Sequence, residues 1–465
     1  MRLEQLLFAH AERTPQRIAV VSGDRRISYR ELARSVRSAS SFMKKRIQPG
    51  ERVAIHLPNG VEFVQLFYAA LAAGASAVPV NTRLAPPEVE HILADAKPAL
   101  VFDGIQDPLF EKAEALEPQS NEDCVILYTS GTTGRPKGAV NTHANVIVQN
   151  VYQHAIAWGI GAGDVFLATT PLAHRAGVAR LANALGLGGT LVAMPKFGAA
   201  AALETIERER VSVAGLPPTV LRLMLPEIRR EPKKCASLRT VIVSAEAFPA
   251  VLLEELSSVL PRVQFHAVYG MSEAAISTAT RAEMLERPGT AGRPFPGIEI
   301  AFDEEELLVR GEFAVMKGYF DNPSANAEAF RGGWFRTGDL VRRDAEGYLY
   351  VVDRKKDMVV SGGYKVYSKE LEQVLVQHPD IEDAAVLGVP DATYGEAVVA
   401  VIQPRPGKKL LEEDVMEHCR ARLAGYKKPR HVLFLEALPR NSLGKVVKRE
   451  LRIRIEAALC PRPDR

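Results

Sequence analysis

The alternation of short apolar runs with helical stretches between residues 140 and 270 constrains the fold most. The runs Val165–Ala168, Thr190–Ala193 and Val241–Val243 are predicted to be buried strands. Stretches with helical spacing separate them, among them Ala200–Arg210 and Val251–Leu260. Such alternation predicts a mainly parallel sheet with helices on both faces. Because ligands of such folds bind at the carboxyl ends of strands, motifs that directly follow a strand are the first candidates for a site.

The predicted fold class for the whole chain is α/β, with a large and a small domain. The 465 residues suffice for two or three domains and a large core. Residues 1–352 are expected to form a large N-terminal domain of helix-flanked, mainly parallel sheets, with a β-rich subdomain at about 295–352. The charged run Asp353–Asp357 interrupts two apolar runs and predicts a boundary, with residues 353–356 as a hinge. Residues 357–465 suffice for a small α+β domain.

Composition narrows the classes of protein to which the chain can belong. Hydrophobic residues at 47% and charged residues at 25% are ordinary for a globular protein, and a net charge of +3 is too small to indicate nucleic-acid binding. The four cysteines form no C-x-x-C pair, which argues against a zinc site or a disulfide framework and fits a reducing cytosol. No signal-peptide core is present, and no stretch reaches the roughly 18 apolar residues of a membrane span. We therefore expect a cytoplasmic protein without stable membrane insertion.

Two local signals predict the starts of helices near the N-terminus. Ser28 and Glu31 form a capping box, because they stand three residues apart just before an apolar periodic stretch. Asn59, together with Glu62, is predicted in the same way to cap a second apolar helix.

The run Tyr128–Gly138 carries the strongest functional signal. It reads Tyr-Thr-Ser-Gly-Thr-Thr-Gly-Arg-Pro-Lys-Gly and follows an apolar run, Val125–Leu127, that is predicted to be a strand. Glycines let the backbone approach an anion, and successive N–H groups, hydroxyls and an ammonium group then form a phosphate cradle. The run does not match the common P-loop pattern. The residues expected to bind phosphate are Thr129, Ser130, Gly131, Thr132, Thr133, Gly134 and Lys137.

This run resembles the signature loop of the adenylate-forming (ANL) superfamily, which includes acyl-CoA synthetases, nonribosomal peptide adenylation domains and luciferases. The resemblance continues through further motifs over nearly the whole chain. It implies a large domain that binds the nucleotide and a small C-terminal domain that moves as a lid. It also implies that ATP, Mg²⁺ and coenzyme A take part in the reaction.

The segment Val268–Glu273 is the second motif that carries the resemblance. An aromatic ring can stack on a base, a hydroxyl can bond phosphate, and a carboxylate can hold Mg²⁺. The family has Tyr-Gly-x-Thr-Glu here, and this chain departs from that pattern only in Ser272. The contacts implied by the resemblance are Tyr269 on the adenine, Gly270 and Met271 beside it, Ser272 on the α-phosphate, and Glu273 with Thr129 at the metal.

Two further segments are similar to family loops around the nucleotide and the acid. Pro171–Gly177 resembles a signature in which an aromatic or His side chain lines the entrance to the carboxylate pocket, which implies that role for His174. Ser244–Ala247 occupies the place of a loop whose backbone cups the adenine. The implied backbone contacts are Ala245, Glu246 and Ala247, with Glu246 departing from the usual glycine-rich sequence.

The C-terminal third carries three more motifs of the family. Trp334–Leu340 is close to the pattern in which a carboxylate accepts hydrogen bonds from both ribose hydroxyls, which implies this role for Asp339, with Arg354 reaching the same ribose or phosphate. Pro439–Lys445 resembles the C-terminal signature, and Lys445 is implied as the electrostatic catalyst of adenylation. The remaining implied residues are Gly363 and Lys365 on a loop that replaces Lys445 after the small domain rotates, and Lys356 as the pivot.

The motifs together predict an ATP-dependent carboxylate–CoA ligase that forms an acyl-adenylate, AMP and pyrophosphate. The acid is expected to be a fatty or aryl carboxylate. A carrier-protein arm as the acceptor stays an alternative, because it presents the same thiol as coenzyme A. A dicarboxylate ligase is another alternative, in which Arg281 pairs with a second carboxylate, although Arg281 fits a surface position equally well. A homodimer is left open beside a monomer.

Overall fold

The computed structural model describes residues 1–104, 121–129, 136–244, 248–391, 393–440 and 446–459. Contacts between residues divide the chain into two compact units. The first unit contains 1–301, 308–336 and 343–350, and the second contains 302–307, 337–342 and 351–465. The chain passes from one unit to the other within four strands, β15 (Glu299–Asp303), β16 (Glu306–Arg310), β19 (Trp334–Arg343) and β20 (Leu349–Arg354).

A nine-stranded sheet forms the middle of the first unit. Six neighbouring strands in it are parallel, and antiparallel strands complete both edges. The order is β14 (Arg293–Pro294), β13 (Ala275–Thr280), β12 (Gln264–Gly270), β11 (Thr240–Val243), β10 (Val213–Gly215), β8 (Val165–Ala168), β9 (Thr190–Ala193), β1 (Ile18–Ser22) and β2 (Arg25–Ser28).

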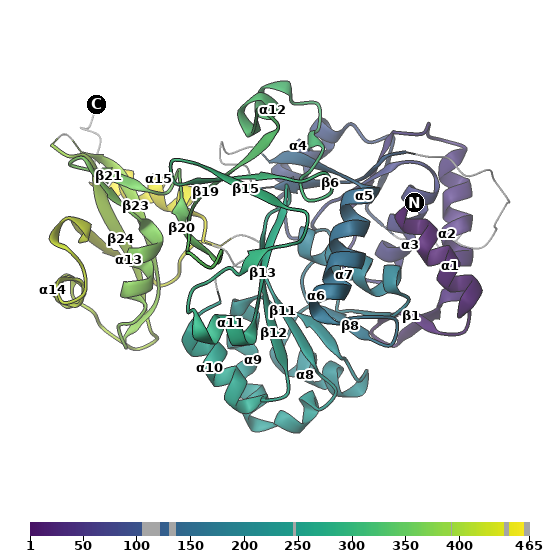
Figure 1. The fold of residues 1–465 in the computed structure, drawn as a ribbon, viewed down its shortest axis with the longest axis horizontal. Helices are drawn as coiled ribbons and strands as arrows, with labels where there is room; N and C mark the ends of the chain where they lie inside the picture. The colour runs from purple at the N-terminus through teal and green to yellow at the C-terminus, as the bar shows by residue number, and fades with distance from the viewer. Residues whose placement is uncertain (105–120, 130–135, 245–247, 392, 441–445, 460–465) are drawn as a thin grey trace. The chain divides into compact units, whose positions relative to one another are not determined.

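The central strands β8, β9, β10 and β11 are mostly apolar because helices cover both faces of the sheet. Leu167 of β8 points into a cluster with the helices α8 (Ala199–Arg208), α9 (Pro218–Arg230) and α10 (Ala250–Val259), which lie together beside β11 and β12 in Figure 1. Phe166 and Ala168 of the same strand point into the opposite cluster. That cluster includes α1 (Leu3–Arg13), α2 (Tyr29–Lys44), α3 (Val61–Ala72), α6 (His154–Trp158) and α7 (Arg175–Leu187).

A six-stranded sheet carries the segment predicted to bind phosphate. Its order is β17 (Gly318–Tyr319), β7 (Lys137–Thr142), β6 (Asp123–Thr129), β4 (Ser76–Pro79), β3 (Arg52–Ile55) and β5 (Leu100–Phe102). Strands β3, β4, β5 and β6 are parallel, whereas β6 and β7 form an antiparallel pair. The sequence did not predict β7, because Gly138 and Asn141 give it no continuous apolar run.

The remaining elements of the first unit are mostly short. They are α4 (Pro86–Ala96), α5 (His143–Val146), a π-helix at Ile147–Gln153, a 3₁₀ turn at Pro232–Cys235, α11 (Arg281–Glu286), α12 (Pro323–Ala329) and β18 (Phe330–Arg331).

The second unit is built on an antiparallel hairpin of two long strands. The strands β23 (Ile381–Asp391) and β24 (Gly395–Pro404) pair along their length, with β21 (Val359–Ser361), β22 (Tyr364–Val366) and β25 (His431–Phe434) beside them. Val386, Val398 and Ala400 face the helices α13 (Ser368–Leu375) and α14 (Glu412–Arg420). Their neighbours in sequence face α15 (Lys448–Leu459), so both faces of this sheet are buried.

The predicted α/β class is confirmed, and the two capping predictions have opposite outcomes. Ser28 accepts a hydrogen bond from the Glu31 backbone N–H, and the Glu31 carboxylate accepts one from Ser28, as the capping box requires. The prediction for Asn59 is wrong, because the residue before α3 is Gly60 and no side chain caps the helix. The Asn59 amide instead donates to the carbonyl oxygens of Thr170 and Met194, on loops distant in sequence.

Candidate active site

Two described residues flank the central part of the phosphate run. Thr129 is the last residue of β6, and Lys137 is the first residue of β7. Thr129 pairs with Lys137 across the hairpin, so the loop between them begins and ends at one place. The residues Ser130, Gly131, Thr132, Thr133 and Gly134 lie outside the described residues. Gly138 is required next to Tyr128, since a Cβ there would come within 2.7 Å of the Ile126 side chain and 3.0 Å of the Tyr128 ring.

The short strand β17 brings Tyr319 beside this hairpin. Tyr319 pairs with Ala139 of β7, and the Lys137 ammonium lies 5.3 Å from the centroid of the Tyr319 ring. The Tyr319 hydroxyl donates a hydrogen bond of 2.9 Å to Oε1 of Glu273. Sequence reasoning missed Tyr319, because a two-residue strand has no periodic pattern that would mark it.

The second motif turns sharply between β12 and β13. Tyr269 and Gly270 end β12, and a Cβ on Gly270 would come within 2.6 Å of the Ala274 carbonyl oxygen. The Met271 N–H donates to the same carbonyl, which closes the turn and places Ser272 and Glu273 at its tip. Only glycine at position 270 permits this geometry.

The backbone around Glu273 is fixed by the six-stranded sheet. The Asn141 side-chain amide of β7 donates to the Ser272 carbonyl oxygen at 3.2 Å, and the Met316 N–H donates to the Glu273 carbonyl oxygen at 2.7 Å. The Glu273 residue is 9% exposed. Residues from β6, β7, β12, β17 and the turn after β12 therefore meet in one place, where the sequence predicted phosphate and metal contacts.

The residues at this place fit a magnesium nucleotide. Across the described parts of the chain, no group of three or more His, Cys, Asp or Glu residues could hold a metal ion by itself. Mg²⁺ at nucleotide sites needs no such cage, because one or two carboxylates, waters and substrate phosphates complete its octahedron. A buried carboxylate at Glu273, a hydroxyl at Thr129 and an ammonium at Lys137 match that donor set. These three residues supply the kinds of donor that a nucleotide with its metal requires.

The segment around His174 forms the start of helix α7. His174 is the N-cap residue, and its Nδ1 accepts a hydrogen bond of 3.5 Å from the Ala176 N–H. Desolvation and the neighbouring Arg175 lower the pKa of His174 to about 4, so the imidazole is neutral near pH 7. Gly177 is required here, because a Cβ would come within 2.2 Å of the Pro171 carbonyl oxygen.

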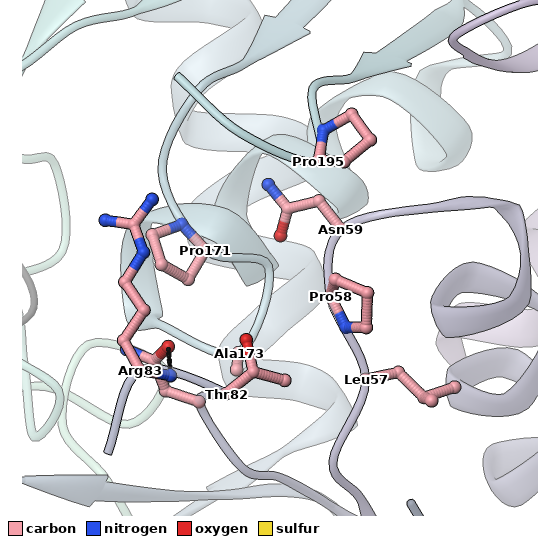
Figure 2. Close-up of a pocket in the computed structure, with 9 residues that line it drawn as sticks. Leu57, Pro58, Asn59, Thr82, Arg83, Pro171, Ala173 and Pro195 are labelled. Atoms are coloured by element: carbon pink, nitrogen blue, oxygen red, sulfur yellow. Dashed lines mark hydrogen bonds between the residues drawn. The ribbon is translucent and has the colours of Figure 1, made fainter. Parts of the chain in front are cut away.

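Figure 2 shows a pocket between loops that follow four strands. Leu57, Pro58 and Asn59 follow β3, and Thr82 and Arg83 follow β4. The loops after β8 and β9 contribute Pro171, Ala173 and Pro195. Asn59 joins these loops, because it also accepts a hydrogen bond of 2.7 Å from the Leu172 N–H. The pocket therefore lies at the carboxyl ends of strands of both sheets, where α/β proteins bind ligands.

Two other predictions in the first unit concern the backbone of Ala245–Ala247 and the side chain of Arg281. Ala245, Glu246 and Ala247 lie outside the described residues, so the backbone cup for adenine stays a prediction. Arg281 begins α11, and its guanidinium donates to the carbonyl oxygens of Pro261 and Val263 at 2.9 and 3.1 Å.

In the second unit, Asp339 and Arg354 form an ion pair. The Arg354 Nε lies 2.8 Å from Asp339 Oδ1, and Asp339 is 2% exposed. The backbone of the next residue, Lys355, donates to the Gly338 carbonyl oxygen, which ties the end of β20 to the Asp339 strand. The two residues expected at the ribose are thus neighbours.

Of the predicted hinge and loop residues in the second unit, Gly363 and Lys356 lie in turns and Lys365 lies in β22. Gly362 and Gly363 connect β21 and β22 with φ of +58° and +81°, as a two-residue hairpin turn with two positive φ angles requires. Lys365 forms an exposed ion pair with Glu305 at 3.2 Å. Lys356 follows Arg354 in a turn, and partial desolvation lowers the pKa of its ammonium. Lys445 lies outside the described residues.

Comparison with known proteins places the chain in a family. Residues 7–119 and 103–320 match the family model described as AMP-binding enzyme, and residues 370–445 match the AMP-binding enzyme C-terminal domain. The chain belongs to the family of AMP-binding enzymes.

Relatives of known activity match nearly the full length. A feruloyl-CoA synthase from an Amycolatopsis species is 34% identical, over 96% of this chain and 97% of its own. A long-chain-fatty-acid–CoA ligase of Mycobacterium tuberculosis is also 34% identical, over 94% and 95%. The o-succinylbenzoate CoA synthetase of Bacillus subtilis has been solved with its acyl-adenylate intermediate, and its structure matches with a TM-score of 0.87, 32% identity and coverage of 96% and 97%. The same enzyme has also been solved with ATP and a magnesium ion, again with a TM-score of 0.87 and 32% identity, over 96% and 98%.

The described helices and the described cysteines give two further properties of the chain. No described helix is both long and apolar enough to cross a bilayer. Cys124, Cys235 and Cys419 are buried thiols without a disulfide.

Proposed function

We propose that this chain is an ATP-dependent carboxylate–CoA ligase that forms AMP and pyrophosphate. In the first half-reaction, the carboxylate of the acid attacks the α-phosphate of ATP, the bond to the β-phosphate breaks, and pyrophosphate leaves. In the second, the coenzyme A thiol attacks the acyl carbon of the acyl-adenylate and AMP leaves. The observation that carries the proposal is the meeting of Thr129, Lys137 and Glu273 in one place.

The residues of the first unit have defined tasks in this proposal. Lys137 and the run that precedes it hold the phosphates, and Glu273 would hold Mg²⁺, which would supply charge neutralisation for the phosphates. The Tyr319 hydroxyl orients the Glu273 carboxylate through its hydrogen bond. Tyr269 stacks on the adenine, Ser272 contacts the α-phosphate, and the neutral His174 lines the way to the acid.

The roles of the C-terminal residues belong to the same proposal. Residues 1–352 act as the nucleotide-binding domain, 353–356 as the hinge with Lys356 as pivot, and 357–465 as a lid that rotates between the half-reactions. Lys445 stabilises the charge that builds between carboxylate and phosphate in the first step. Asp339 and Arg354 bind the ribose, and Gly363 with Lys365 serves the thiol step.

Two assays test the proposal directly. Exchange of labelled pyrophosphate into ATP that depends on an added acid measures the first half-reaction, and AMP release with coenzyme A measures the second. Lys445→Ala should abolish the exchange yet largely spare conversion of supplied acyl-adenylate to thioester, whereas Lys356→Pro should do the reverse because proline fixes φ. Equal loss of both steps in both variants would contradict the assigned roles.

The same assays identify the acceptor. Coenzyme A and a phosphopantetheinylated carrier protein are offered separately to the acyl-adenylate, and we expect thioester on coenzyme A. We further propose that the protein is cytoplasmic, in keeping with its free buried thiols. We also propose a homodimer, which sedimentation would test.

A further inference from the structure

Arg180 is a buried cation in the middle of helix α7. The residue is 4% exposed. Gly215 leaves room for its side chain, because a Cβ there would come within 3.1 Å of Arg180 Cδ and 3.3 Å of Nε. The Trp158 ring lies near the guanidinium, with its centroid 5.8 Å from the guanidinium carbon. The surroundings of Arg180 are therefore a glycine backbone and an aromatic ring, neither of which carries negative charge.

No carboxylate of the described residues compensates the charge of Arg180. Among the residues that the structure describes, none forms an ion pair with Arg180, and its Nη1 is buried without a hydrogen-bond partner. Arg175, at the start of the same helix, donates to the neutral amide oxygens of Gln149 and Asn150. Burial and Arg175 lower the pKa of Arg180 to about 9, which leaves it cationic near pH 7.

Such an arrangement is costly unless a ligand supplies the missing charge. A buried guanidinium without a counter-ion loses its hydration and gains nothing in return. The first turn of α7 contains no acidic residue that could offset either arginine or the partial positive charge of the helix start. A bound anion would offset the charges of Arg175 and Arg180 and the partial positive charge at the start of α7.

Arg180 also stands where a substrate is expected. Its neighbour Gly215 ends β10, which lies between the parallel strands β8 and β11. The Thr169 hydroxyl, directly after β8, donates to the Gly215 carbonyl oxygen at 3.3 Å, and the Pro171–Gly177 motif follows at once. The side chain of Arg180 therefore lies against the carboxyl end of β10, and its helix is the one that His174 caps.

We propose that Arg180 determines acid specificity by binding a second carboxylate at the far end of the substrate. The substrate class is then an aliphatic or aryl acid with two carboxylates, one activated and one held by Arg180. A planar guanidinium can bind a carboxylate through two parallel hydrogen bonds, which explains arginine rather than lysine at this position. This inference rests on the proposed function, since it names the acid on which that ligase acts.

Matched pairs of acids test the inference. Each pair has the same length and consists of an α,ω-dicarboxylate and the monocarboxylate whose far end is a methyl group, with terephthalate and 4-methylbenzoate as the aryl pair. The measurement is kcat/KM in acid-dependent pyrophosphate exchange. The wild type should prefer the dicarboxylate of at least one pair, and Arg180→Met should lower that preference about tenfold or more, since it keeps the bulk and removes the charge.

Further variants keep the test decisive if Arg180→Met does not fold. Arg180→Lys keeps the charge without the planar fork and should retain part of the preference. Gly215→Ala should weaken the preference by displacing the side chain of Arg180. As a readout apart from turnover, the preferred dicarboxylate should raise the Tm of the wild type without ATP and leave the Tm of the Arg180 variants unchanged.

The outcomes separate this inference from the function on which it rests. If no acid of either kind supports exchange in the wild type, the ligase function is wrong and the inference falls with it. If monocarboxylates support exchange and dicarboxylates do not, the ligase function stands and the role of Arg180 is overturned. A preference that changes in Arg281→Met but not in Arg180→Met would also overturn it.

Discussion

Replacing Tyr319 by phenylalanine removes one oxygen atom and keeps the ring that lies 5.3 Å from the Lys137 ammonium. The lost oxygen donates the 2.9 Å hydrogen bond to the Glu273 carboxylate. Without that bond the carboxylate rotates more freely, and binding Mg²⁺ must then restrict it. The variant therefore isolates the orientation of Glu273 from the contact between Lys137 and the ring.

The expected magnitude follows from the environment of Glu273. A hydrogen bond to a charged group contributes about 1.5–3 kcal/mol, and loss of a partner to a metal ligand typically weakens metal binding about 10–100-fold. Glu273 is 9% exposed, so that water can replace part of the lost bond. We expect the lower end, about a tenfold rise in the Mg²⁺ concentration needed for half-maximal exchange, which corresponds to about 1.4 kcal/mol.

The assay is acid-dependent pyrophosphate exchange titrated with Mg²⁺ at fixed ATP. Tyr350→Phe is the matched control, because the Tyr350 hydroxyl donates to Asp344 at 3.1 Å and the sequence places no site role on either residue. Tyr319→Leu should add a weaker affinity for the nucleotide, since it also removes the ring beside Lys137. A folded Tyr319→Phe variant with the Mg²⁺ dependence of the wild type would refute the reasoning.

Three further predictions concern stability, measured by urea unfolding. Gly177→Ala should cost about 1–3 kcal/mol, because its Cβ would lie 2.2 Å from the Pro171 carbonyl oxygen, whereas Gly161→Ala, with nothing within 4 Å, should stay within about 0.5 kcal/mol. Asn59→Ala should cost about 2–4 kcal/mol, since it leaves one buried carbonyl, one partly buried carbonyl and one buried N–H without these partners, and a loss under about 1 kcal/mol would contradict the assigned bonds. Burial raises the pKa of Glu4 to about 7 from 4.5, so its contribution to stability is present below about pH 4.5 and is lost as pH rises to about 7; Glu4→Gln should remove a loss of up to about 3 kcal/mol, and equal pH dependence of both proteins would exclude this.

The predictions of the fold class and of the candidate site both rest on contiguous motifs in the sequence. The phosphate run, the Val268–Glu273 segment and the alternation of strands and helices each concern residues close in the chain. Gly177 and Gly270 illustrate this, because the close backbone approaches that require them lie within six residues of each glycine. Such features can be recognised in the sequence, because local backbone geometry restricts which residue type can occupy each of these positions.

Tertiary structure alone decided the features that depend on strand order. Tyr319 reaches Glu273 because β17 pairs with β7, and Asn59 joins two loops more than 110 positions further along the chain instead of capping its own helix. Arg180 looks like any helical arginine in the sequence, and only the tertiary structure shows that it is buried beside Gly215 with no counter-ion among the described residues. The physical reason is that burial and pairing of a polar group depend on elements brought together from distant positions, whereas propensity and turn geometry depend on neighbours in the chain.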